Sequence, residues 1–491
     1  MPSLRSRLAS GVRWTVSIRV VERVIGFAST LILVRLLVPA DFGVVAMGTA
    51  IQEILAGITA FGFTQALIRM PRHDHDAYST AFTLNAIAGA AIALVLIAAI
   101  PPAVHWYGDQ RVTHVLIVLA AISFISGFRN SGLVRYERAL HFRPLFLMAL
   151  ARKAVSFGVA AACALIWHDY RALLAGMLAS AFVETAISFR LTRFRPRFTL
   201  AKSRELLAFS AWVVAGQATS MLGRRGKDLL VGQRLGATSL GQYAVALDLA
   251  TMATMEIVAP VTRAVYPGYM RMKDDAGRLF SAFVRVWGVI ALLALPSAAG
   301  MACLAGLIAE VVLGPNWVGA APLMTLLAVI GGLQAMNSCY WPMLLARLGP
   351  KANFKLSALS FGLTIPSFAL ALWLAGLLAA IAAWLCCVLV MLFVGASWLV
   401  KDLGGTYKPL FKGLVRPAIG AGVMVLSLVT IKPFLVTGDL WLARAVVLLL
   451  LVVFGALMYT AVVTCLWLAA GRPRGAESEL LFVVAKRFAR G

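Results

Sequence analysis

Two long apolar stretches of the chain contain ionisable side chains where a bilayer-spanning helix would normally have apolar ones. The stretches cover residues 11–37 and 206–235, and each is long enough to cross a bilayer, which takes about 20 residues. The ionisable residues of the first are Arg19, Glu22 and Arg23, and those of the second are Arg224, Arg225, Lys227 and Asp228. Charged groups at membrane depth cost several kcal/mol, so we expect both sets to face a protein interior or a water-filled cavity.

The spacing of these residues predicts a basic surface on each helix. Arg19, Glu22 and Arg23 stand at i, i+3 and i+4 and therefore share a helix face. Arg224, Lys227 and Asp228 repeat that spacing, whereas Arg225 points about 100° away. In each set an acid neutralises one base and leaves net positive charge.

An arginine suits an oxyanion ligand because its planar fork binds two oxygens and stays charged. We expect the two helices to be facing walls of one cationic cavity that holds an anionic ligand. The expected ligand-binding residues are Arg19, Arg23, Arg224, Arg225 and Lys227. The alternative is that these residues form interhelical ion pairs that fix the fold, and both roles can hold together.

Further charges lie within other apolar stretches. A carboxylate at this depth could couple proton or Na+ movement to transport, whereas the alternative is structural pairing or exposure at a helix end. The candidates for pairing or coupling are Glu22, Asp228, Glu53, Asp248, Glu256 and Arg263.

The composition is that of an all-α polytopic membrane protein. Hydrophobic residues make up 61% of the chain and charged residues 13%, whereas a soluble domain is nearer a quarter charged. The apolar runs are long and continuous, unlike the alternating segments of an outer-membrane barrel. The net charge of +25 would suggest nucleic acid in a soluble protein. Here the excess of basic residues in cytoplasmic loops accounts for it, and we expect no nucleic-acid partner.

Hydropathy and charge together predict fourteen transmembrane helices. Their expected cores are 12–37, 42–68, 79–104, 112–133, 146–167, 171–191, 206–235, 240–266, 279–308, 318–345, 354–375, 378–400, 411–431 and 441–469. With the N-terminus inside, the connections on the outer side hold only the basic residues Arg111, Arg171, Lys432 and Arg444. The positive-inside rule therefore predicts that both termini face the cytoplasm.

A weak internal repeat predicts how the helices are grouped. Shifting the chain by 198 residues places Trp14 on Trp212 and Gly43 on Gly241, each glycine following a short outer turn. An even number of spans per repeat gives two parallel lobes. We expect an N-terminal lobe at 1–192, a basic cytoplasmic linker at 193–204, a C-terminal lobe at 205–400, two extra helices within 401–470 and a basic amphipathic tail at 471–491.

Several chemistries are not supported by any motif. The chain has no P-loop, Rossmann glycine pattern, zinc motif or Ser/His/Asp constellation, so we expect no cofactor, no metal and no enzymatic activity. The outer loops are too short for a folded catalytic domain.

Four stretches resemble bacterial polysaccharide flippases. They are Arg35-Leu36-Leu37-Val38-Pro39-Ala40-Asp41-Phe42-Gly43 with Gly62-Phe63-Thr64-Gln65-Ala66-Leu67-Ile68, then Arg135-Tyr136-Glu137-Arg138-Ala139-Leu140-His141-Phe142, and Leu313-Gly314-Pro315-Asn316-Trp317. These are similar to the Wzx-type exporters of lipopolysaccharide and exopolysaccharide units, within the multidrug/oligosaccharidyl-lipid/polysaccharide superfamily. The turn His168-Asp169-Tyr170-Arg171 departs from the family's usual Gly-rich pattern.

The resemblance implies a two-lobed transporter of the bacterial inner membrane. Its implied substrate is an undecaprenyl-diphosphate-linked oligosaccharide, moved from the cytoplasmic to the periplasmic leaflet as the lobes rock. Membrane lipids and a polysaccharide polymerase or export machinery would be partners.

Two other functions remain open from the sequence. A multidrug/cation antiporter of the same superfamily would favour twelve spans and an acidic cavity. A membrane polymerase or ligase would need a large outer loop, which the sequence lacks.

Overall fold

The computed structural model describes residues 21, 25–26, 28–59, 63, 67, 74–139, 141–208, 211–435, 440–473 and 477–478. Within these ranges the side chains of 207–217, 256–257, 259–260, 262–264, 267, 350–351 and 353 are not described. The described residues form helices joined by short turns and contain no strand. The chain divides into two compact units, Met1–Gly241 and Gln242–Gly491.

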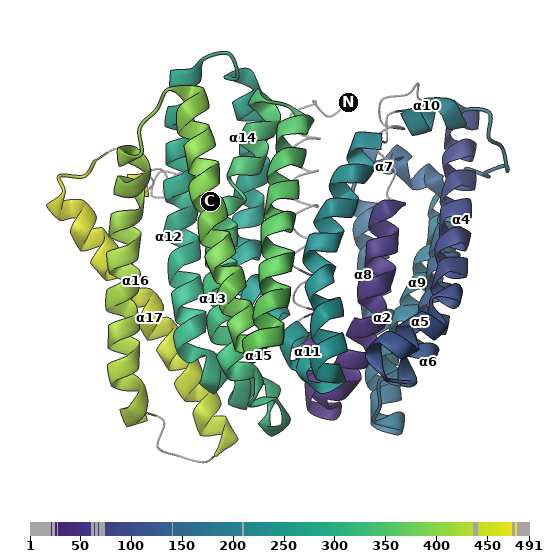
Figure 1. Ribbon diagram of the computed structural model, residues 1–491, viewed down its shortest axis with the longest axis horizontal. Helices are drawn as coiled ribbons and strands as arrows, with labels where there is room; N and C mark the ends of the chain where they lie inside the picture. Colours follow the sequence, from purple (N-terminus) through teal and green to yellow (C-terminus); the bar gives the residue numbers. More distant parts are fainter. Residues whose placement is uncertain are drawn as a thin grey trace. The chain divides into compact units, whose positions relative to one another are not determined.

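The first unit is a bundle of helices in which α4 packs on α6, α8 on α9, and α6 on both α9 and α2 (Figure 1). Its elements are α2 Pro39–Ile58, α4 His75–Ala98, α5 Ile100–Tyr107, α6 Arg111–Gly127, η1 Ser131–Leu133, α7 Val134–Arg138, α8 Arg143–Trp167, α9 Arg171–Leu191, α10 Ser203–Ala208 and the first part of α11 Ala211–Arg271.

The second unit is built around α12, which packs against α13 and α16. Helix α16 packs in turn on α17, and α13 on α15. After the rest of α11, its elements are α12 Ala276–Ile308, η2 Ala309–Leu313, η3 Pro315–Trp317, α13 Ala320–Asn337, α14 Tyr340–Arg347, α15 Pro350–Leu403, α16 Lys408–Leu435 and α17 Trp441–Ala469.

Caps in the sequence explain where several helices begin. Asp74 accepts a hydrogen bond from the Ala77 backbone N–H at 2.9 Å, and Asp275 accepts one from Arg278 at 3.0 Å. Each satisfies a backbone donor that the first turn of a helix would otherwise leave unpaired. Helix α2 has Pro39 in its first turn, where the missing N–H costs nothing.

Two glycines divide long helical stretches at the predicted boundaries. Helix α11 breaks at Gly236, with φ of 76°, and α15 breaks at Gly376, with φ of 84°. Glycine adopts this left-handed region without the Cβ penalty that other residues incur. The arms on either side correspond to the spans expected at 206–235, 240–266, 354–375 and 378–400.

The described helices confirm a multi-pass helical protein. Nine of them are long and apolar enough to cross a membrane, and the bent pair α6 with η1–α7 makes ten if it is one span. This is consistent with the fourteen expected spans, since α11 and α15 each supply two arms and most of the first span lies outside the described residues. The expected tail helix also lies largely outside them.

The linker (193–204) is fixed to the first unit rather than hanging free. Hydroxyl groups of α4 accept its backbone N–H groups: Arg197 donates to Ser79 at 3.3 Å and Thr199 to Thr83 at 3.0 Å. Asn130 donates through its side-chain amide to the Phe194 carbonyl at 3.0 Å. The linker therefore replaces the hydrogen bonds of a sheet or helix with bonds to side chains of the bundle.

Asn130 is the central residue of this attachment and is almost fully buried. Its side-chain oxygen also accepts from the Gly132 N–H at 2.8 Å, and its own N–H donates to Ser188 Oγ at 3.0 Å. An Asn130→Ala substitution would leave a buried donor and a buried acceptor unsatisfied. Each such loss costs about 1–3 kcal/mol.

We therefore expect Asn130→Ala to lower the stability of the purified protein by about 2–4 kcal/mol, since two buried groups lose their partners. Thermal unfolding in detergent, followed by loss of the monodisperse peak, measures this. Asn316→Ala, at an exposed position, is the matched control and should leave the transition unchanged. Equal stability of the two variants would contradict the role assigned to Asn130.

Candidate functional site

The charged turn of α11 meets α2 through a two-pronged ion pair. Arg225 donates from Nε to Glu53 Oε2 at 2.7 Å and from Nη2 to Glu53 Oε1 at 2.6 Å. These residues are separated by 172 positions in the chain. Parallel hydrogen bonds of this kind are among the strongest that an arginine makes, and they fix the orientation of the guanidinium plane.

A second carboxylate holds the same guanidinium from α11 itself. Arg225 Nη1 donates to Asp228 Oδ2 at 2.9 Å, one turn further along the helix. The two carboxylates differ in exposure: the side chain of Asp228 is 3% exposed and that of Glu53 is 40% exposed. Asp228 is therefore a fixed partner of Arg225, whereas Glu53 can reach water without disrupting the helix.

Lys227 lies beside this pair and is also buried. Its ammonium donates to the Gly223 carbonyl at 2.5 Å. With Lys227 included, the group contains two bases and two acids and is formally neutral. That balance lowers the cost of keeping charged groups between packed helices.

Arg224 differs from its neighbours because it is exposed. Its guanidinium contacts Met221 Sδ at 3.0 Å, on its own helix. Spacing alone allowed Asp228 to pair with Arg224 at i, i+4 or with Arg225 at i, i+3. In the structure Asp228 pairs with Arg225, which also reaches Glu53 on α2.

The remaining predicted residues are placed only in part. Arg19, Glu22 and Arg23 lie outside the described residues, so the facing wall of the expected cavity is not described. Glu256 and Arg263 are on α11, but their side chains are not described. Asp248 is exposed on α11 within the second unit.

A polar contact that spacing alone did not reveal orients α2 next to Glu53. Gln52 donates to Ser123 Oγ on α6 at 2.8 Å. This hydrogen bond sets the rotation of α2 on the bundle and hence the direction of the adjacent Glu53 side chain. The signal in the sequence was a glutamine within an apolar span, which normally finds a polar partner on a neighbouring helix.

The starts of α2 and of the second arm of α11 touch through their backbones. A Cβ on Gly43 would overlap the carbonyl of Ala237, and one on Gly241 would overlap the carbonyl of Pro39. The same 198-residue shift that aligns Gly43 with Gly241 aligns Pro39 with Ala237. The contact is therefore reciprocal between repeat-related residues, and only glycine permits the approach at both positions.

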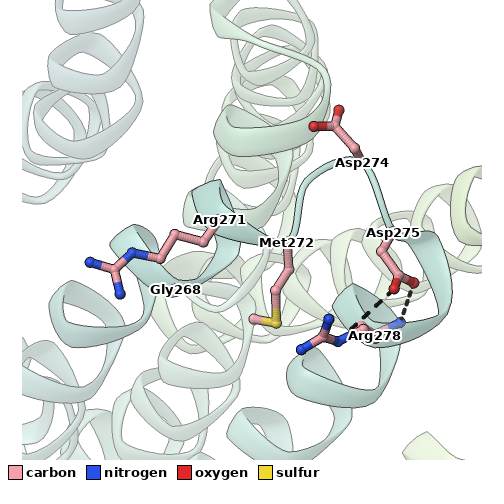
Figure 2. A pocket seen from close by; sticks show the side chains of 6 residues that line it. All are labelled: Gly268, Arg271, Met272, Asp274, Asp275 and Arg278. Carbon is pink, nitrogen blue, oxygen red and sulfur yellow. Dashed lines mark hydrogen bonds and ion pairs between the residues drawn. The ribbon is translucent and has the colours of Figure 1, made fainter.

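An open pocket of about 510 Å³ lies elsewhere, where α11 turns into α12 (Figure 2). Its charged lining consists of Arg271, Asp274, Asp275 and Arg278. Asp275 caps α12 and pairs with the Arg278 guanidinium at 4.0 Å. Two acids balance two bases, so this pocket lacks the excess positive charge of an anion site.

Among the described residues no group of three His, Cys, Asp or Glu side chains could hold a metal ion.

Comparison with known proteins identifies relatives of this chain. A family model described as polysaccharide biosynthesis protein matches residues 32–322, more than half of the chain. The lipopolysaccharide biosynthesis protein WzxC of Escherichia coli (strain K12) is 22% identical over 422 residues, covering 84% of this chain and 85% of the relative. The succinoglycan biosynthesis transport protein ExoT of Rhizobium meliloti (strain 1021) is 26% identical over 423 residues, 84% of each chain.

Solved structures share the fold at low sequence identity. The lipid II flippase MurJ in an inward closed conformation superposes with a TM-score of 0.70 at 11% identity, over 92% of this chain and 100% of MurJ. An inward-facing multidrug resistance MATE family transporter of the MOP superfamily gives 0.62 at 15% identity, over 78% and 94%. The expected resemblance is thus confirmed, and the chain belongs to the family of polysaccharide biosynthesis proteins.

Proposed function

We propose that this protein is a flippase that moves an undecaprenyl-diphosphate-linked oligosaccharide from the cytoplasmic to the periplasmic leaflet of the bacterial inner membrane. The observation that carries the proposal is the Arg225 guanidinium held between Glu53 and Asp228. Family membership and the MurJ-like fold support it. A diphosphate and polar sugars cannot cross hydrocarbon unaided, so they need a charged, hydrated path.

The geometry suggests how the diphosphate would be taken up. Glu53 occupies the two donors of Arg225 that a phosphate would use, with the same two-oxygen geometry. In our proposal the diphosphate exchanges with Glu53, which turns toward water, while Asp228 keeps the guanidinium in place. Arg224, on the exposed side of α11, adds positive charge near the path of the substrate.

The same exchange offers a route to ion coupling. A proton or Na+ that neutralises Glu53 would free Arg225 for the diphosphate, and its release would restore the Glu53–Arg225 pair. Glu22, Asp228, Asp248, Glu256 and Arg263 are further members of the proposed charge network.

The glycine contact supports an alternating mechanism. In the proposed topology, with both termini in the cytoplasm, Gly43 and Gly241 each follow an outer turn. The proposed lobes, 1–192 and 205–400, would meet there when the outer side is closed. Opening toward the periplasm would separate Gly43 from Ala237 and Gly241 from Pro39. In this proposal the two extra helices within 401–470 and the tail at 471–491 stand outside the repeat. A polysaccharide polymerase would receive the flipped product.

A second candidate is a multidrug or cation antiporter, favoured only by the fold shared with a MATE transporter. A cation carrier would need uncompensated acids in its site. In the described site two acids are matched by Arg225 and Lys227, with Arg224 in excess. Export of a labelled cationic dye, compared with accumulation of lipid-linked repeat units in a deletion strain, distinguishes the two functions.

Neutralising substitutions separate substrate binding from structural pairing. Arg225→Gln removes the partner of Glu53 and of the buried Asp228, leaves the group with one excess negative charge, and should reduce both folded protein and export. The double substitution Glu53→Gln with Arg225→Gln restores the charge balance and should restore the folded protein. We expect export to stay at least about tenfold below wild type, because the fork that binds phosphate is gone. The measurement is complementation of a deletion strain, normalised to folded protein. Full export by the double variant would show that the pair is only structural.

Removing Arg224 tests the exposed charge without disturbing the buried group. Arg224→Gln should lower export about three- to tenfold with no change in protein level, since an exposed charge mainly attracts the anion. Arg234→Gln, near the end of the same arm of α11 and also exposed, is the matched control. The loss should shrink at high salt if Arg224 only attracts the anion from a distance, because salt screens that attraction, and should persist if Arg224 contacts the substrate directly. Equal export by the two variants would remove Arg224 from the proposed path.

Adding a methyl group at the glycine contact tests the outer closure. Gly43→Ala or Gly241→Ala should keep the outer side from closing, because the Cβ would overlap a backbone carbonyl. In a cysteine-free background carrying Val38→Cys, we expect a membrane-impermeant maleimide to react at least about threefold faster, and export to fall.

Gly158→Ala, at a helical position with open space around it, is the control for the glycine substitutions. It should change neither labelling nor export. If Gly241→Ala behaves like Gly158→Ala in both assays, the contact is not part of the transport cycle.

A further inference from the structure

The linker (193–204) exposes arginines at alternate positions. Arg193, Arg195 and Arg197 are exposed, whereas Phe194 between them is buried. Thr192, just before them, has an extended backbone with φ of −109° and ψ of 135°, and no helix forms over residues 192–200. In an extended chain successive side chains point to opposite sides, so the three arginines share one face. None of them makes a hydrogen bond or ion pair that would neutralise it among the described contacts of the linker.

The opposite face of the linker is anchored to the bundle. The Phe194 ring lies in an apolar cluster with Tyr78 and Leu206, and the Arg135 guanidinium stacks over it at 4.8 Å. The hydrogen bonds to Ser79 and Thr83 hold the following residues. The arginines are thus carried on a fixed backbone, and less entropy is lost when they bind than for arginines on a loose loop.

Two exposed apolar side chains follow the arginines in the linker. Phe198 is 72% exposed and Leu200 is 52% exposed, directly after the last arginine of the series. Exposed apolar groups next to a row of arginines match the boundary between headgroups and acyl chains, where apolar residues insert while arginines stay with the phosphates. The Phe198 ring also contacts the Phe82 ring of α4 at a centroid distance of 5.6 Å, which fixes its position while most of its surface stays exposed.

We propose that the linker is a binding surface for anionic glycerophospholipids, with Arg193, Arg195 and Arg197 on the headgroup phosphates and Phe198 and Leu200 in the acyl region. The proposal rests on the topology proposed above, which puts the linker at the cytoplasmic leaflet, but not on transport. An acidic protein partner would match the arginines and leave the exposed apolar pair unexplained. Bound lipid would hold the end of α9 and the start of α10 at a fixed depth.

Native mass spectrometry of the full-length protein tests this proposal. The protein is released from nanodiscs that contain phosphatidylcholine with or without phosphatidylglycerol in both leaflets, so the result does not depend on topology. The test variant carries Arg193→Gln, Arg195→Gln and Arg197→Gln. The control variant carries Lys401→Gln, Lys408→Gln and Lys412→Gln, which removes the same charge from exposed positions of the second unit.

We expect the arginine variant to retain at least roughly threefold less phosphatidylglycerol than wild type, with phosphatidylcholine unchanged, since each basic residue near an anionic surface adds to binding. Replacing the three arginines by lysine should restore most of the retention. The lysine-site control should lose much less. Equal retention by the arginine variant and the control, or loss of a copurifying acidic protein with lipid retention unchanged, would overturn the proposal. Export activity measured in parallel separates this outcome from failure of the flippase function.

Discussion

A half-buried guanidinium needs a carboxylate partner, and the contact of α2 with the charged turn of α11 supplies one. Arg225 is held by Asp228 from its own helix and by Glu53 from α2. Gln52, beside Glu53, ties α2 to Ser123 of α6. The ion pair is therefore connected to the packing of the first unit, and moving α2 would break it. A static scaffold could bury apolar residues here at lower cost, which is why we infer that the charge serves transport.

The exposure of the two carboxylates gives the site its asymmetry. A buried acid such as Asp228 cannot leave its base without an uncompensated charge, whereas the half-exposed Glu53 can exchange its partner for water. The backbone contact of Gly43 and Gly241 adds a second feature that can be formed or broken as a unit. In our proposal these two features would connect occupancy of the site with closure of one side, as alternating access requires.

Hydropathy predicted the helices well, because a span of apolar residues in a bilayer has no alternative to hydrogen bonding within itself. The breaks at Gly236 and Gly376 fall between the expected spans, where glycine adopts the left-handed conformation that ends one helix before the next begins. The partner of Arg225 could not be predicted, since spacing orders residues around one helix and says nothing about which face a distant helix covers. The linker was predicted as basic, but its attachment was not. The sequence feature that could have indicated this attachment is the group of hydroxyl residues Ser79, Thr80 and Thr83 near the start of α4, which accept hydrogen bonds from the linker backbone.

The central claim is that a diphosphate replaces Glu53 on Arg225. A cryo-EM structure of the full chain in nanodiscs, with an undecaprenyl-diphosphate-linked oligosaccharide bound, tests it most directly. The account predicts phosphate oxygens within hydrogen-bond distance of Arg225 Nε and Nη2, Asp228 still on Nη1, and the Glu53 carboxylate turned away. A substrate bound elsewhere with the Glu53–Arg225 pair intact would contradict it.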